Sequence, residues 1–125
     1  MKEFMLLIRN TGEHVDHMQP EEHESFLRSC ESYIGKLKAN NQLIAAQPLA
    51  KNGTVIRKTG DQWTSKEVTK NEEIQVGYYH IYAGDIEEAI SIAKENPEFA
   101  FTNTASIEVR PIKTKEQTTG FEYPK

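Results

Sequence analysis

The sequence has one cysteine, no long apolar run and no excess of basic residues. The lone Cys30 among 125 residues excludes an internal disulfide framework and any metal site made of paired cysteines. The longest apolar run, Phe4 to Ile8, is far shorter than the roughly 20 residues that span a bilayer. The net charge of −4 argues against a broad phosphate-binding surface for nucleic acid.

Signals for export and for common cofactors are also missing. The start, Met1-Lys2-Glu3, has no basic region followed by a cleavable apolar segment. The sequence has no glycine-rich phosphate loop and no GxSxG motif of a serine hydrolase. These absences predict a cytoplasmic protein that binds no cofactor and contacts neither membrane nor nucleic acid.

What is present indicates one polar globular domain. Hydrophobic residues make up 37% of the chain and charged residues 27%, which is typical of a folded soluble domain. A chain of 125 residues predicts a single domain with a core of normal size. We place this domain at residues 1–112 and expect a polar C-terminal tail at 113–125.

Hydrophobic periodicity and turn signals divide the domain into elements. The helices are expected from Pro20 to about Ala39, where apolar residues recur every three to four positions, and from Asp85 to a point before Pro97. Residues 10–19 and 66–71 are expected to form loops. The expected strands cover 3–9, 43–49, 54–57, 62–64, 76–83 and 105–112, with 54–64 forming a hairpin.

This order, β-α-β-hairpin-β-α-β, predicts an α+β fold. Split βαβ units of this kind give a ferredoxin-like antiparallel sheet with two helices on one face. The other sheet face would stay uncovered in a protein this small. We therefore expect a homodimer that pairs two sheets, a dimeric α+β barrel.

Strand alternation assigns side chains to the two faces of the sheet. Ile107 and Val109 should meet the helices, which directs their neighbours to the opposite face. That face should carry a titratable imidazole, phenols, a carboxylate and two guanidinium groups, a mixture suited to a small anionic ligand. The candidate residues are Arg9, Tyr78, His80, Tyr82, Glu108 and Arg110.

Simpler interpretations of these residues remain open. Glu108 and Arg110 are two apart on one strand and can form an ordinary surface or interface ion pair. His80 can be a hydrogen-bonded interface histidine, and tyrosines are common at interfaces for packing reasons. Trp63 of the hairpin is expected at the dimer edge or at the mouth of the cavity.

A second group of titratable residues lies near the N-terminus. Glu13, His14, Asp16 and His17 are close together, and His23 follows, but their spacing matches no metal-binding motif. We expect a solvated loop without a metal ion, with His23 able to cover the edge of the helix core. Cys30 lies on the apolar face of the first helix and should be a core residue.

Several segments resemble the YCII-related family, in particular its DGPF branch. They are residues 76–81 (VGYYHI), residues 84–89 (GDIEEA) and residues 106–112 (SIEVRPI), and the resemblance covers about residues 1–112. The Asp-Gly-Pro-Phe signature is absent, because residues 65–68 (SKEV) occupy its place, although Glu72 and Glu73 keep a carboxylate nearby. The resemblance implies a cytoplasmic, dimeric α+β barrel and leaves the reaction open.

Two functions follow from these observations. The first is a dimeric small-molecule-binding module without catalysis, which the altered signature loop favours slightly. The second is a small-molecule enzyme in which His80 acts as general acid and base and Arg9 and Arg110 hold an anion. Tyr78 or Tyr82 would then donate to a developing oxyanion.

Overall fold

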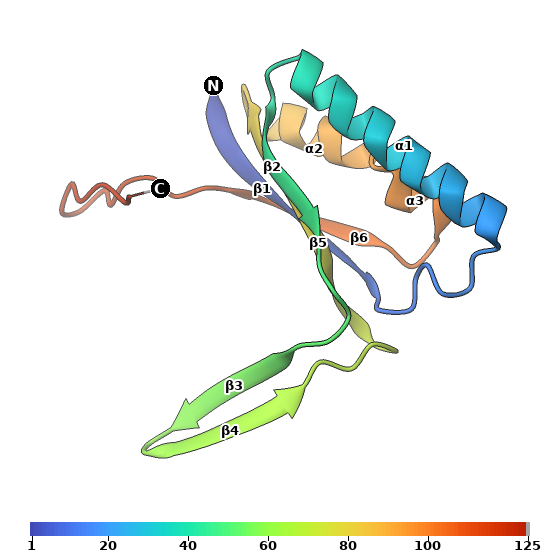
Figure 1. Ribbon diagram of the computed structural model, residues 1–125. Helices are drawn as coiled ribbons and strands as arrows, with labels where there is room; N and C mark the ends of the chain where they lie inside the picture. The colour runs from blue at the N-terminus through green and yellow to red at the C-terminus, as the bar shows by residue number, and fades with distance from the viewer. Residues whose placement is uncertain (125) are drawn as a thin grey trace.

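The computed structural model describes residues 1–124, which form a four-stranded sheet with helices on one face and a separate hairpin (Figure 1). The fold is therefore α+β. Among the described residues, no helix is long and apolar enough to cross a membrane. The elements are β1 (Lys2–Thr11), α1 (Pro20–Ala39), β2 (Leu43–Pro48), β3 (Thr54–Thr59), β4 (Gln62–Glu67), β5 (Glu73–Ala83), α2 (Ile86–Lys94), α3 (Pro97–Phe101) and β6 (Ser106–Pro111).

The main sheet has the strand order β2-β5-β1-β6, and each neighbouring pair is antiparallel. Strand β1, one of the two central strands, alternates between half-buried and buried residues from Glu3 to Thr11. Phe4, Leu6 and Ile8 face the helices and are at most 3% exposed. Their burial against α1 and α2 forms the core, and it fixes which residues of every paired strand face the same way.

The helices begin and end at residues that suit those positions. Pro20 opens α1, where a missing N–H removes no hydrogen bond, and Asn41 follows the helix with a left-handed φ of 57°. The Asp85 side chain caps α2 by accepting a hydrogen bond from the Glu88 N–H at 2.8 Å. The side chains of α1 that reach the core include Tyr33 and Leu37.

The second helical region differs from the sequence-based expectation. The helix ends before Pro97 as expected, but Pro97 then opens a further short helix, α3. Within α2, Ile90 is 37% exposed, whereas Ile92 is 7% exposed and joins the core. Ala89, Ile92 and Ala93 form the buried stripe, because a three- and four-residue spacing keeps them on one side of the helix. Ile90 therefore lies at the margin of this stripe.

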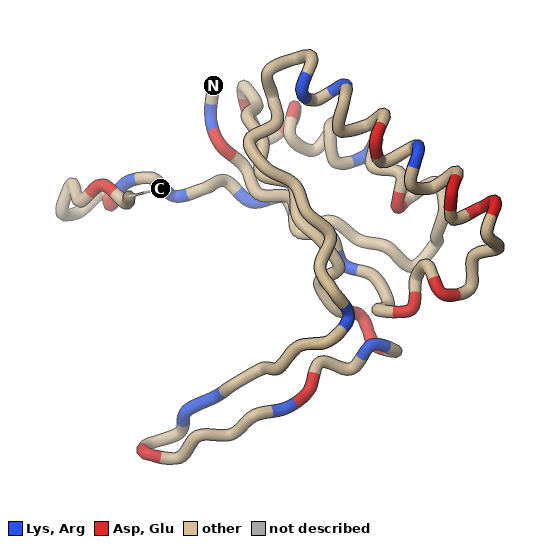
Figure 2. Tube along the Cα trace, in the orientation of Figure 1, with Lys and Arg blue, Asp and Glu red and all other residues tan. Residues whose placement is uncertain are grey.

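Two further segments extend away from the sheet. The hairpin β3–β4 is exposed along both strands, with Trp63 66% exposed and Lys58 Nζ 5.4 Å from the centre of its ring. The C-terminal segment turns back on itself through a bridge between Lys115 and Glu122. Figures 1 and 2 show the hairpin and this segment leaving the sheet in different directions.

Candidate functional site

The residues singled out from the sequence share the sheet face that the helices leave uncovered, here called the open face. Buried Leu6 stands opposite Tyr79 and Val109, so the adjacent Leu7 and its partners Tyr78 and Glu108 turn the other way. The same register brings His80, Tyr82 and Arg110 to this face. Arg9 lies there by the alternation of β1 and its pairing with β6, although the β1–β5 register shifts between Ile8 and Arg9.

These candidates separate into local pairs within one chain. His80 Nε2 lies 2.8 Å from Glu3 Oε1, and Arg110 contacts Glu108 on its own strand at 3.5 Å. His80 and Arg110 both stand opposite Met5, from the two sides of β1, so their backbones are about two strand spacings, roughly 10 Å, apart. Within a single chain the imidazole and the guanidinium groups do not converge on one point.

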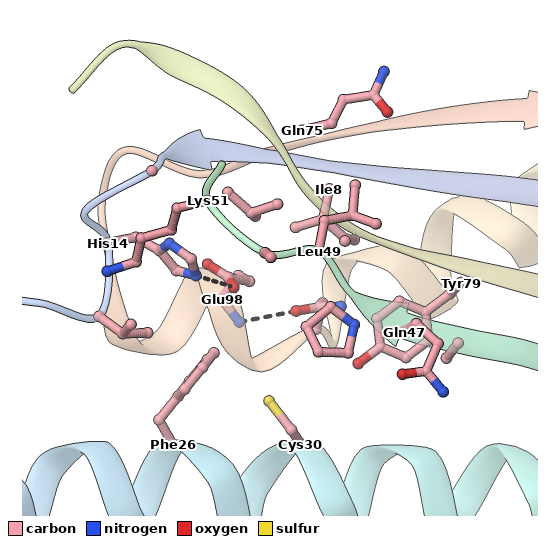
Figure 3. A pocket seen from close by; sticks show the side chains of 18 of the residues that line it. Ile8, His14, Phe26, Cys30, Gln47, Leu49, Lys51, Gln75, Tyr79 and Glu98 are labelled. Atoms are coloured by element: carbon pink, nitrogen blue, oxygen red, sulfur yellow. Dashed lines mark hydrogen bonds and ion pairs between the residues drawn. The ribbon is translucent and has the colours of Figure 1, made fainter. Parts of the chain in front are cut away.

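A cavity of about 290 Å³ lies on the other side of the sheet, beneath α1 (Figure 3). The side chains of Phe26 and Cys30 point into the cavity from α1, and Tyr79 lines it from β5. The segment after β2 and the start of α3 also line the cavity, which is partly open to solvent. Most of its lining is apolar, including Ile8, Val15, Leu27, Ile34, Leu49, Ile74 and Val76.

A buried ion pair forms the wall of this cavity nearest the N-terminal loop. His14 Nε2 lies 3.2 Å from Glu98 Oε1, with the side chains only 13% and 9% exposed. His14 Nδ1 donates to the Thr11 carbonyl at 3.0 Å, because a carbonyl can only accept. The hydrogen bond with Glu98 raises the pKa of His14 above its ordinary value, against the opposing effect of burial. The pair is therefore best described as imidazolium and carboxylate.

Asn10 donates a hydrogen bond to the second oxygen of the Glu98 carboxylate. This side chain is fully buried, and its Nδ2 donates to Glu98 Oε2 at 2.8 Å and to Thr102 Oγ1 at 3.0 Å. Its Oδ1 accepts from Thr104 Oγ1 at 2.6 Å and from the Thr11 N–H at 2.8 Å. The network joins β1 to α3 and to the segment before β6, and it leaves no capacity on Asn10 unused.

Asn96 also lies at this end of the cavity, but the nitrogen of its side-chain amide lacks a hydrogen-bond partner among the described residues. The side chain caps α3, since its Oδ1 accepts from the Glu98 N–H at 2.9 Å. Asn96 is 3% exposed and lines the cavity, yet its Nδ2 has no hydrogen-bond partner among the described residues. Buried polar groups are nearly always hydrogen-bonded in native proteins, so this donor is exceptional.

Burial also sets the acidity of the other polar side chains around the cavity. It raises the pKa of the Cys30 thiol to about 11, so the thiol stays protonated at neutral pH. Burial raises the pKa of Tyr33 and Tyr79 well above the ordinary range. The Asn96 amide acts in the opposite direction on both phenols, but no hydrogen bond of good geometry joins it to either one. None of these groups is poised to exchange a proton near neutral pH.

The histidines of the N-terminal loop do not gather around one point. His14 turns inward to Glu98, while the 82% exposed His17 lies 3.6 Å from Glu13. His23 lines the cavity from α1. No group of three or more metal-ligating side chains suited to a metal ion occurs in residues 1–124. The expectation of a solvated loop is wrong for His14, because a partner distant in sequence neutralises its charge in the interior.

Sequence reasoning missed the cavity and the α3 groups that line it. The signal was present in Asn96-Pro97-Glu98, because asparagine followed by proline is a common start of a helix. Recognising that start would have placed Asn96 and Glu98 at a helix end, but not beneath α1. No protein-family model and no curated protein matches the chain, so the assignment of the site rests on its own geometry.

Proposed function

We propose that this protein is a small-molecule-binding module and that its ligand occupies the cavity beneath α1. The observation that carries the proposal is the cavity itself. The cavity is partly open to solvent, and preformed apolar pockets with a few polar groups are where proteins bind small molecules. A mainly apolar space of about 290 Å³ with a few polar groups at one end has the size and lining of a small ligand site.

We also propose that the protein is a homodimer with the ferredoxin-like arrangement of the YCII-related family. The sheet order β2-β5-β1-β6, with the long helices on one face, supports this fold. Half-buried Met5, Leu7, Tyr78 and Tyr82 on the open face support a second copy as its cover. We place this dimer in the cytoplasm, because the single cysteine provides no internal disulfide of the kind common in exported proteins. Sedimentation showing a stable monomer at micromolar concentration would contradict it.

The alternative is a small-molecule enzyme that works on the open face of the dimer. The contact between His80 and Glu3 supports it, because a carboxylate that holds one imidazole nitrogen orients the other. His80 would be the general acid and base, while Arg9 and Arg110 hold an anion between the two sheets. Arg110→Ala would then weaken the binding of small carboxylates and phosphates, measured by thermal shift, and leave the dimer intact.

Two neighbouring alanines of β2 separate these proposals experimentally. Ala46 stands opposite Tyr79 and lines the cavity, whereas Ala45 stands opposite His80 on the open face. Ala46→Phe should therefore fill the cavity and Ala45→Phe should spare it. The assay is two-dimensional NMR of the protein titrated with small neutral and charged aromatic fragments.

The outcomes of the fragment titration are distinct. Fragments that shift the resonances of Cys30 and Tyr79 in the wild type and in Ala45→Phe, but not in Ala46→Phe, would support the cavity as the binding site. If no fragment shifts these resonances, or if Ala46→Phe leaves their binding unchanged, the proposed function is wrong. Anions that bind only the wild type and Ala46→Phe would favour the enzyme on the open face.

A further inference from the structure

The orientation of the Asn96 amide in the cavity is fixed by its role at the start of α3. Its Oδ1 accepts from the Glu98 N–H at 2.9 Å, so the oxygen and nitrogen of the amide cannot be exchanged without losing that hydrogen bond. The Nδ2 is consequently the atom left without a partner in the described part of the chain. The phenol oxygens of Tyr33 and Tyr79 lie near enough to interact with this amide, but neither is aligned to accept from Nδ2. A well-aligned acceptor can come from the cavity that Asn96 lines.

The charges around the cavity are already compensated. His14 and Glu98 neutralise each other, and the second oxygen of Glu98 accepts from Asn10. At the mouth, Lys51 forms an ion pair with Asp16. An anion in the cavity would therefore lose its hydration without gaining a free cation, which is unfavourable in an apolar surrounding. The same reasoning disfavours a cationic ligand, since His14 already compensates the charge of the Glu98 carboxylate.

The remaining lining sets the size and polarity of the ligand body. Aliphatic and aromatic side chains from α1, β1 and β5 form most of the wall. An apolar cavity of about 150 Å³ is large enough to hold benzene. A cavity of about 290 Å³ therefore has room for a ring that carries one or more substituents.

From these three observations we propose that the ligand is an uncharged molecule with an apolar body and one carbonyl-type oxygen, which accepts a hydrogen bond from Asn96 Nδ2. This inference rests on the proposed function, because it names the ligand class of the same cavity. In this proposal, Asn96 selects a ligand that carries a hydrogen-bond acceptor, and the apolar side chains of the cavity contact the apolar body of that ligand.

Three probes of nearly equal shape test the ligand class on the wild-type protein. Acetophenone has the carbonyl, ethylbenzene replaces it with a methylene group, and benzoate replaces the acetyl group with a charged carboxylate. We expect acetophenone to bind about fivefold more tightly than ethylbenzene, the gain expected of one neutral hydrogen bond to a buried donor. Benzoate should bind at least about tenfold more weakly than acetophenone, because no unpaired cation receives it. The measurement is the dissociation constant from NMR titration.

Asn96→Ser provides the matched variant. Serine keeps an oxygen that can cap α3 but lacks the amide nitrogen. The preference for acetophenone over ethylbenzene should fall to within about twofold in this variant, while the binding of ethylbenzene itself stays unchanged. The comparison of the three probes on the wild type tests the ligand class even if Asn96→Ser does not fold.

The failures of the two proposals can be told apart. Ethylbenzene binding the wild type as tightly as acetophenone, or benzoate binding more tightly, would overturn the inferred ligand class and leave the cavity as a binding site. The same holds if Asn96→Ser retains the full preference for acetophenone. Failure of all three probes to bind the wild type would instead overturn the proposed function.

Discussion

Replacing His14 with alanine should destabilise the protein far more than its place in an N-terminal loop indicates. The substitution leaves the Glu98 carboxylate, which is 9% exposed, without its cationic partner. Removing one member of a buried ion pair costs about 3–5 kcal/mol, and the slight exposure of His14 places this site near 3 kcal/mol. For a domain of this size that corresponds to a fall in Tm of about 10 °C.

The effect should also depend on pH in a definite direction. The pKa of His14 in the folded protein is raised above the 6.5 of an unperturbed histidine by its hydrogen bond with Glu98. The stabilisation from protonated His14 is therefore complete below about pH 6.5 and is lost as the pH rises through the higher folded value. The difference in unfolding free energy between wild type and His14→Ala should be larger at about pH 5.5 than at about pH 9.

Urea denaturation followed by circular dichroism at both pH values provides the measurement. His17→Ala is the matched control, because His17 is 82% exposed and its ion pair with Glu13 should contribute less than about 1 kcal/mol. Adding Glu98→Gln to His14→Ala should recover part of the loss, since it removes the unpaired buried charge. Equal destabilisation by His14→Ala and His17→Ala, with no difference between the two pH values, would refute this reasoning.

Three further substitutions and one chemical treatment test other parts of the structure. Gly35→Ala should raise the unfolding free energy by about 0.5–1 kcal/mol, because the added Cβ meets nothing within 4 Å. Gly12→Ala should lower the unfolding free energy, because its Cβ would lie 2.5 Å from the Lys70 carbonyl oxygen. Chemical denaturation compares the two variants. Cys30 should react with a soluble disulfide reagent much more slowly than a free thiol at about pH 8, since its pKa is about 11, and equal rates would contradict its burial. Asp85→Ala should lower Tm by a few degrees through loss of the α2 cap, worth about 1 kcal/mol, and an unchanged thermal unfolding curve would show that the cap contributes nothing.

Local sequence patterns determined the order of the strands along the chain and the positions of α1 and α2. The alternation in β1 and β5 is a property of consecutive residues, and it correctly assigned Tyr78, His80 and Glu108 to the face away from the helices. The start of α1 at Pro20 and the cap of α2 at Asp85 depend on single residues next to each helix. Interactions within a few residues can be recognised from the sequence because their geometry is set by the backbone alone.

Only the tertiary structure decided the chemistry of the interior. His14 is a buried cation, since folding places Glu98 beside it from a helix far along the chain. The cavity exists because α1 and β5 leave space between them, and its volume depends on packing that no local pattern encodes. Asn96 shows both contributions: its role as a helix cap is local, whereas the unpaired Nδ2 results from the assembly of distant elements around it.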